Sequence, residues 1–90
     1  MHAAFLDFAH RAIARLIETS EFSVARDIAD TVLGVDASAV DIERKLVWLY
    51  SRLGSQSAAE TQYQHLAAGF RADGLEPPRL EDLIRPSRLA

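Results

Sequence analysis

The sequence predicts an all-α fold of antiparallel helical hairpins, with about four main helices and a short C-terminal helix. Apolar residues recur at the i, i+3, i+4 and i+7 spacing of a helix in four successive stretches. No stretch alternates apolar and polar residues over the length of a strand. The links between the stretches are short, which makes neighbouring helices antiparallel.

Length and composition fit one small domain, which we place at residues 1–84 and follow with a C-terminal tail at residues 85–90. Apolar residues make up 49% of the chain and charged residues 26%, as in ordinary soluble domains. No apolar run approaches the ~20 residues that span a bilayer. Cysteine is absent, which suits a reducing cytoplasm. We therefore expect a cytoplasmic protein without membrane contact.

The charge pattern bears on the class of partner. The net charge is −3, and the ten basic residues are scattered along the chain. A domain that holds nucleic acid by its phosphates normally shows a basic face. Direct binding to DNA is therefore not expected, and any DNA contact would belong to a separate domain outside this chain.

The first two helices are predicted from apolar periodicity. One ends near Thr19 and carries an apolar stripe formed by Phe5, Phe8, Ala9, Ala12, Ile13, Leu16 and Ile17. The next runs from about Ser23 to Leu33, with Ser20 or Ser23 as its N-cap and Gly34 as its end. Its apolar side holds Val24, Ala25, Ile28, Ala29 and Val32.

The stretch from Leu46 to Tyr63 is the most specific signal in the sequence. We expect Asp36 or Ser38 to cap the third helix, and its buried side is predicted to hold Ile42, Leu46, Leu49, Tyr50 and Leu53. Gly54 follows where a helix end needs a left-handed residue. Ser57 and Glu60 form a capping-box pattern that predicts a fourth helix from Ser57 to near Gly74. Pro77-Pro78 bars further helix, and residues 79–84 are predicted as a short last one.

An internal repeat relates the two predicted hairpins. Ala25 and Ala59 lie 34 positions apart, and the same offset pairs Leu16 with Tyr50. A small residue lets two helices approach closely while a bulky residue opposite fills the gap. The residues that we expect to pack the two repeats are Leu16, Ala25, Ala29, Leu46, Tyr50, Gly54, Ala59 and Tyr63.

The 34-residue period is that of the tetratricopeptide repeat, and the second copy resembles that repeat. From Ile17 to Ile84 the chain also resembles the bacterial transcriptional activator domain, the tetratricopeptide-like domain that accompanies a winged-helix domain in antibiotic-regulatory-type activators. The matching segments read SVARDIADTVLGVDAS, DIERKLVWLYSRLGSQSAAETQYQHLAAGF and GLEPPRLEDLI. The chain departs from the family at two positions. Ala37 stands where the family usually has a proline, and Glu43 stands at the family's early tryptophan position.

The resemblance implies a function in regulation. It implies either a fragment of a larger bacterial transcriptional regulator or a reduced member of the family. In both cases the domain would mediate self-association, signal reception or contact with a protein partner. It implies neither catalysis nor a cofactor. The partner is a protein, which includes a second copy of the chain as a homodimer.

The expected interaction surface is the outer side of the third helix, as in helical-repeat domains that bind along the first helix of each hairpin. When the resemblance to these repeat domains is extended along the third helix, its outer side holds Asp41, Arg44, Trp48, Ser51 and Arg52. An exposed tryptophan between two arginines is typical of an interface anchor. The alternative is that Trp48 packs against a neighbouring helix. Arg44 and Arg52 suit an acidic or C-terminal carboxylate ligand, with a solvated face as the alternative.

Two other functions are weighed against this one. A purely structural adaptor or oligomerisation scaffold would use the apolar surface expected at one end of the repeat, around Phe5, Phe8 and Ile13. An enzyme is not expected, because no serine has a histidine and aspartate arrangement and the histidines lack metal-ligand spacing. His65 is predicted to be a surface polar residue.

Overall fold

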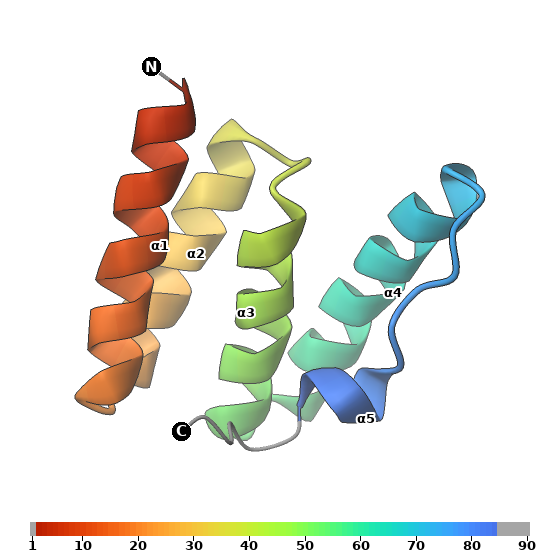
Figure 1. Ribbon diagram of the computed structural model, residues 1–90. Helices are drawn as coiled ribbons and strands as arrows, with labels where there is room; N and C mark the ends of the chain where they lie inside the picture. Colours follow the sequence, from red (N-terminus) through yellow and green to blue (C-terminus); the bar gives the residue numbers. More distant parts are fainter. Residues whose placement is uncertain (1, 85–90) are drawn as a thin grey trace.

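The computed structural model describes residues 2–84, and the predicted tail at residues 85–90 lies outside this range. Within it the chain forms α1 (His2–Glu18), α2 (Phe22–Val35), α3 (Val40–Arg52), α4 (Gln56–Ala72) and the short α5 (Leu80–Leu83). No strand is present between residues 2 and 84. The predicted all-α class, with four main helices in hairpins and a short fifth helix, is confirmed (Figure 1).

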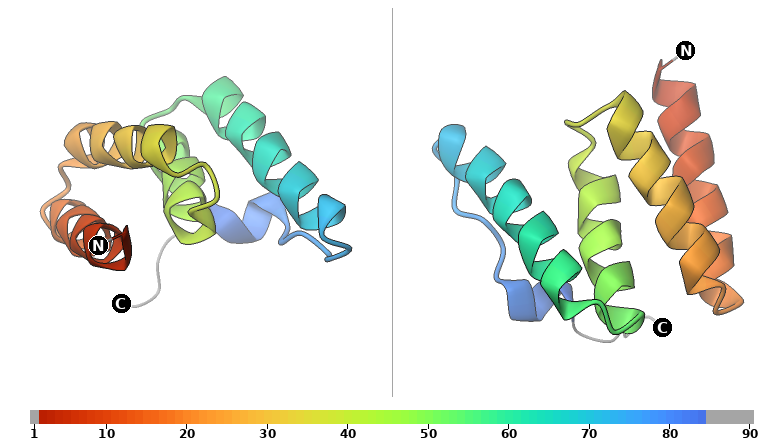
Figure 2. Two further views of the ribbon diagram at one scale, coloured as in Figure 1. Left: turned by 90° about the horizontal axis from the view of Figure 1, so that it is seen from above. Right: turned by 180° about the vertical axis from the view of Figure 1, so that it is seen from behind.

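Helix α3 lies at the centre of the arrangement. It packs against α2, α4 and α5, whereas α1 packs mainly against α2. Seen from above, α1, α3 and α5 lie toward one side of the molecule, while α2 and α4 lie toward the other (Figure 2, left). The first helices of both hairpins therefore share one face.

The core lies where α1, α2 and α3 meet. Helix α2 contributes the small residues Ala25 and Ala29, which allow its neighbours to come close. Larger side chains from α1 and α3 fill the remaining space, and the full cluster is Ala9, Ile13, Ala25, Ala29, Val32, Ala39, Ile42, Leu46 and Leu49. In the second hairpin, Ala59, Leu66 and Ala67 of α4 are also buried.

The two hairpins repeat with the predicted period. Helix α1 ends at Glu18 and α3 at Arg52, while α2 begins at Phe22 and α4 at Gln56, so both boundaries recur after 34 residues. The turn is also repeated. Ser20 has a φ of 61° and Gly54 a φ of 79°, both in the left-handed region.

The hydrogen bonds of these turns explain the left-handed residues. The Glu21 N–H donates to the Leu16 carbonyl at 2.8 Å, and the Ser55 N–H donates to the Tyr50 carbonyl at 2.8 Å. This six-to-one bond is the Schellman ending of a helix, which requires a left-handed residue just after the helix. Glycine adopts that conformation readily, whereas Ser20 does so at a steric cost.

Several predicted helix ends are wrong. Helix α4 begins at Gln56 with Ser55 at its N-cap and no side-chain cap, so Ser57 and Glu60 do not form a capping box. Helix α2 has Glu21 at its N-cap instead of Ser20 or Ser23, and it continues through Gly34. The Schellman turns set these starts, because a short turn leaves the next helix no other place to begin.

The start of α3 also differs from the prediction. Its N-cap is Ala39, without a side-chain cap. Asp36 instead closes the link before it, because its Oδ1 accepts hydrogen bonds from the Ser38 N–H at 3.0 Å and the Ser38 hydroxyl at 2.6 Å.

The segment after α4 folds back along the second hairpin. Gly74 has a φ of 76°, and the Leu75 N–H donates to the Phe70 carbonyl at 2.9 Å. The chain then runs without helix to Arg79, and the Tyr63 hydroxyl donates to the Pro78 carbonyl at 2.8 Å. Helix α5 follows and packs against α3, so this segment covers the C-terminal end of the repeat.

Candidate interaction surfaces

Trp48 lies half-buried on α3, where it packs against the core cluster. Its ring meets the ring of Phe22 edge-on, with centroids 5.6 Å apart and planes at 84°. The guanidinium carbon of Arg52 lies 5.2 Å from the centroid of the Trp48 ring. An arginine at this distance is attracted to the negative face of the indole. Trp48 therefore both packs against α2 and presents surface beside a cation.

The rest of the predicted surface lies on the same side of α3. Asp41, Arg44 and Arg52 are exposed, and Ser51 is half-buried. Arg44, Trp48 and Arg52 follow one another at four-residue spacing, so the structure places an aromatic ring between two cations along one helix. This arrangement suits a partner that brings carboxylates and an apolar group.

The predicted repeat-packing residues separate into two groups. Ala25, Ala29, Leu46 and Ala59 are buried. The remaining members lie at the margins of the core or in the turn, and they are Leu16, Tyr50, Tyr63 and Gly54.

Tyr50 is the residue whose acidity responds to this packing. Burial raises the pKa of the Tyr50 phenol, and the negative charges of Asp30 and Asp27 raise it further, while Arg26 opposes the rise. The neutral phenol is therefore the form that the fold favours.

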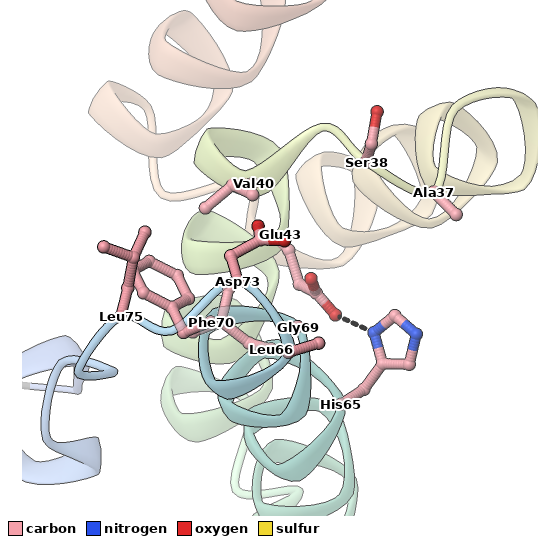
Figure 3. Close-up of a pocket in the computed structure, with 11 residues that line it drawn as sticks. Ala37, Ser38, Val40, Glu43, His65, Leu66, Gly69, Phe70, Asp73 and Leu75 are labelled. Atoms are coloured by element: carbon pink, nitrogen blue, oxygen red, sulfur yellow. Dashed lines mark hydrogen bonds and ion pairs between the residues drawn. The ribbon is translucent and has the colours of Figure 1, made fainter.

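Glu43 is a buried acid, whereas the sequence analysis named it only as a departure from the family pattern and did not predict its burial. Only 3% of its surface is exposed, although it carries a carboxylate. Its Oε2 accepts a hydrogen bond from the Gln62 amide and lies 2.6 Å from Nδ1 of His65 (Figure 3). Because a carboxylate accepts hydrogen bonds, Nδ1 of His65 is the donor. His65 remains 65% exposed at its side chain, as predicted for a surface residue, but it has a specific partner.

A signal for Glu43 was present in the sequence. Glu43 stands three and four positions before Leu46 and Val47, which are both fully buried. Residues at this spacing share a face of a helix. The position that precedes Glu43 by 34 residues is the buried Ala9, so the repeat also predicts an interior place.

A groove of about 520 Å³ opens above Glu43, between the start of α3 and the second half of α4 (Figure 3). Apolar side chains line most of it, with Glu43 and Asp73 as its carboxylates and His65 at its edge. Positions 34 residues before Phe70, Asp73 and Leu75 are Asp36, Ala39 and Asp41, which lead into α3. The groove is therefore the place where a third hairpin would begin.

A second groove of about 320 Å³ lies between α1 and α2. It is lined by Ala9, Ala12, Ile28 and Val32 at its floor, with Phe5, Phe8 and Val24 among its walls. Phe5, Phe8 and Val24 are exposed, but Ile13 is fully buried. The expectation that Ile13 contributes to the exposed apolar end is wrong, because Ile13 is part of the core shared with α2 and α3.

Neither groove resembles a metal centre. Between residues 2 and 84 no three histidine, cysteine, aspartate or glutamate side chains gather closely enough to hold a metal ion. Within the same range no helix has both the length and the apolar character needed to cross a membrane.

Comparison of the chain with protein-family models, with curated proteins and with solved structures gives no match.

Proposed function

We propose that this chain is a non-catalytic helical-repeat domain that mediates regulatory protein–protein contacts within a bacterial transcriptional regulator. The observation that carries the proposal is the 34-residue recurrence of both helix boundaries and of the left-handed turn. Stacked hairpins of this period bury one face against each other and leave the first helices to form a shared binding side. The sequence resemblance to the bacterial transcriptional activator domain supplies the regulatory context.

The binding side that we propose is the face of α3 formed by Asp41, Arg44, Trp48, Ser51 and Arg52. Its two exposed arginines flank an aromatic ring, and arginine forms forked hydrogen bonds with carboxylates. The partner is therefore a protein segment with acidic residues or a C-terminal carboxylate. In this proposal the domain works in the cytoplasm, requires no cofactor, and leaves DNA contact to a separate domain.

The intrinsic fluorescence of Trp48, the only tryptophan in the chain, tests this surface directly. The probe is a synthetic helical peptide that carries glutamates four positions apart around a leucine. We expect the peptide to change the emission of Trp48, and we expect binding to weaken as salt is added. Arg44→Glu should reduce the affinity about tenfold or more, since a charge pair becomes a repulsion.

Arg71→Glu is the matched control, because Arg71 is exposed on α4, away from this face. It changes the net charge by the same amount and should leave the peptide affinity nearly unchanged. Equal losses in both variants would mean that the peptide responds only to overall charge. If the wild-type chain does not bind the peptide at millimolar concentration, the proposed binding surface on α3 is wrong.

The reading frame that encodes the chain tests the regulatory context. A winged-helix pattern upstream would support a transcriptional regulator, whereas an unrelated neighbouring domain would favour an adaptor.

A structural oligomerisation scaffold is the second candidate function. The observation that favours it is the exposure of Phe5, Phe8 and Val24 beside one groove. Sedimentation at several concentrations combined with the peptide titration distinguishes the two functions, because a pure scaffold self-associates but does not bind the acidic peptide.

A further inference from the structure

The repeat relates an exposed residue of α1 to a buried residue of α3. Phe8 and Ile42 are 34 positions apart, and Phe8 is 67% exposed while Ile42 is 0% exposed. Ile42 is buried because α2 packs against that side of α3. Phe5 and Ala39 show the same contrast, with 39% and 9% exposure. The side of α1 that carries Phe8 is thus the equivalent of a helix-packing surface.

The two ends of the repeat differ in their covering. At the C-terminal end, residues 75–79 and α5 lie over the second hairpin, anchored by the hydrogen bond from Tyr63 to Pro78. At the N-terminal end, Phe8 and Val24 stand 67% and 47% exposed beside the groove between α1 and α2. The C-terminal end is only partly covered, because the groove above Glu43 stays open and Leu75 is 57% exposed beside it. At the N-terminal end no segment among residues 2–84 lies over Phe8, and a two-fold contact between copies would use this patch on both sides.

This end is complementary to itself in shape. Phe8 projects beside a groove whose floor includes the small residues Ala9 and Ala12. When two α1 helices cross antiparallel about a two-fold axis, the Phe8 ring of each copy can face Ala12 of the other, whereas Ala9 is buried in the core. A large residue that fills a space over small residues is the usual means by which helices pack closely.

The charges at this end are also complementary to themselves. Asp7 and Arg11 lie together on one side of Phe8 on α1 and form an exposed ion pair, with Arg11 Nη2 2.9 Å from Asp7 Oδ2. In an antiparallel pair of helices, the Asp7 of one copy approaches the Arg11 of the other at both ends of the contact. A two-fold interface places the same patch on both sides, so a patch with both signs of charge suits it.

We propose that a second copy of this chain packs against the N-terminal end of the repeat, giving a closed two-fold dimer held by Phe8 and Val24. The inference rests on the proposed interaction function and names one partner for it. Because the same surface is used by both subunits, the assembly stops at two chains.

Sedimentation velocity of the whole chain over a wide concentration range tests the dimer. We expect a monomer–dimer equilibrium, and Phe8→Glu should weaken the dimer at least about tenfold because it places two carboxylates in an apolar contact. The fold of this variant should persist by circular dichroism, since Phe8 is already exposed. Leu75→Glu is the matched control, because Leu75 is a 57% exposed apolar residue at the other groove.

A charge exchange provides a second measurement that does not depend on the core. Arg11→Asp alone should weaken the dimer, and the double variant Asp7→Arg with Arg11→Asp should restore it. A chain that stays monomeric, a dimer that Phe8→Glu leaves intact, or an open series of larger species would each overturn the proposal. Binding of the acidic peptide, reported by Trp48 fluorescence, is measured in parallel. A wild-type chain that does not dimerise but still binds the peptide would contradict only the dimer and not the proposed binding surface on α3.

Discussion

His65 Nδ1 lies 2.6 Å from Oε2 of Glu43, which links the exposed side of α4 to the buried side of α3. Gln62, one turn earlier on α4, donates to the same oxygen. Within residues 2–84 no buried side-chain nitrogen or oxygen lacks a hydrogen-bond partner. The Glu43 carboxylate is accommodated in the interior because α4 supplies these two donors.

Replacing Glu43 should show how much its hydrogen bonds with Gln62 and His65 contribute to the free energy of unfolding. Glu43→Gln keeps the shape but substitutes an amide group for one of the oxygens, so at least one donor from α4 loses a good acceptor. We expect a loss of about 1–2 kcal/mol in the free energy of unfolding, measured by urea denaturation. Glu60→Gln is the control, since Glu60 is exposed on α4 and should change stability by less than about 0.5 kcal/mol. Equal effects of the two variants would show that the link adds nothing.

The sequence predicted the class and order of the helices because apolar spacing and the left-handed Gly54 are local signals. It did not predict the helix starts, because the pattern of Ser57 and Glu60 is degenerate and the turn after α3 fixes Gln56 as the first residue. The burial of Glu43 was not predicted because its charge suggested a solvated position, although its spacing from Leu46 indicated the core. The donors on α4 that permit its burial depend on tertiary packing, which no local pattern contains.

The surfaces were predicted unevenly for a similar reason. Periodicity placed Trp48 off the apolar stripe of α3, but the ring of Phe22 covers part of it from another helix. Phe8 matched the apolar stripe of α1, yet none of the helices between residues 2 and 84 covers that side. Which apolar residues stay exposed depends on how many hairpins stack, and the spacing within one helix carries no information about that number.

Two glycine substitutions should have opposite effects on stability. Gly54 has a φ of 79°, and an alanine there must adopt a conformation that costs roughly 1–2 kcal/mol. Gly34 lies inside α2 with no atom within 4 Å of an added Cβ, so Gly34→Ala should stabilise the fold by about 0.5–1 kcal/mol. Thermal unfolding of both variants measures the difference. A Gly34→Ala variant less stable than wild type would contradict the helical environment of that position.

Removing one hydroxyl should loosen the segment that covers the second hairpin. Tyr63→Phe deletes the hydrogen bond to the Pro78 carbonyl but keeps the ring. We expect a loss of about 0.5–1.5 kcal/mol in stability, together with faster proteolysis between Leu75 and Arg79. If limited proteolysis of this segment is unchanged, the bond does not hold it in place.

Tyr50 should make the fold sensitive to alkaline pH. Its pKa in the folded chain lies above the ordinary tyrosine value of about 10, chiefly because of burial and secondarily because of Asp30. The unfolded chain therefore loses this proton first, so the stabilisation is complete below about pH 10 and is lost as pH rises through the folded pKa. Urea denaturation at pH 8 and pH 11 should show a smaller loss in Tyr50→Phe than in wild type. Identical losses would assign the alkaline destabilisation to other groups.

Trp48 offers a way to separate packing from partner binding. Because its ring is half-buried against Phe22, Trp48→Ala should lower the free energy of unfolding by about 2 kcal/mol, which is less than the 3–5 kcal/mol typical of a fully buried aromatic. Trp48→Phe retains an aromatic ring beside Phe22 and Arg52 and should lower it by less than about 1 kcal/mol. Circular dichroism should show helical chains in both cases.

The binding measurement then distinguishes the two roles of this residue. A fluorescein-labelled version of the acidic peptide replaces tryptophan emission as the signal, and anisotropy reports its affinity. If Trp48 anchors the partner, Trp48→Phe should bind several-fold more weakly than wild type although its stability is nearly unchanged, because the smaller ring offers less apolar contact. If the loss of peptide affinity parallels the loss of stability in both variants, Trp48 acts only by packing α3 against α2. Peptide binding would then depend on Arg44 and Arg52.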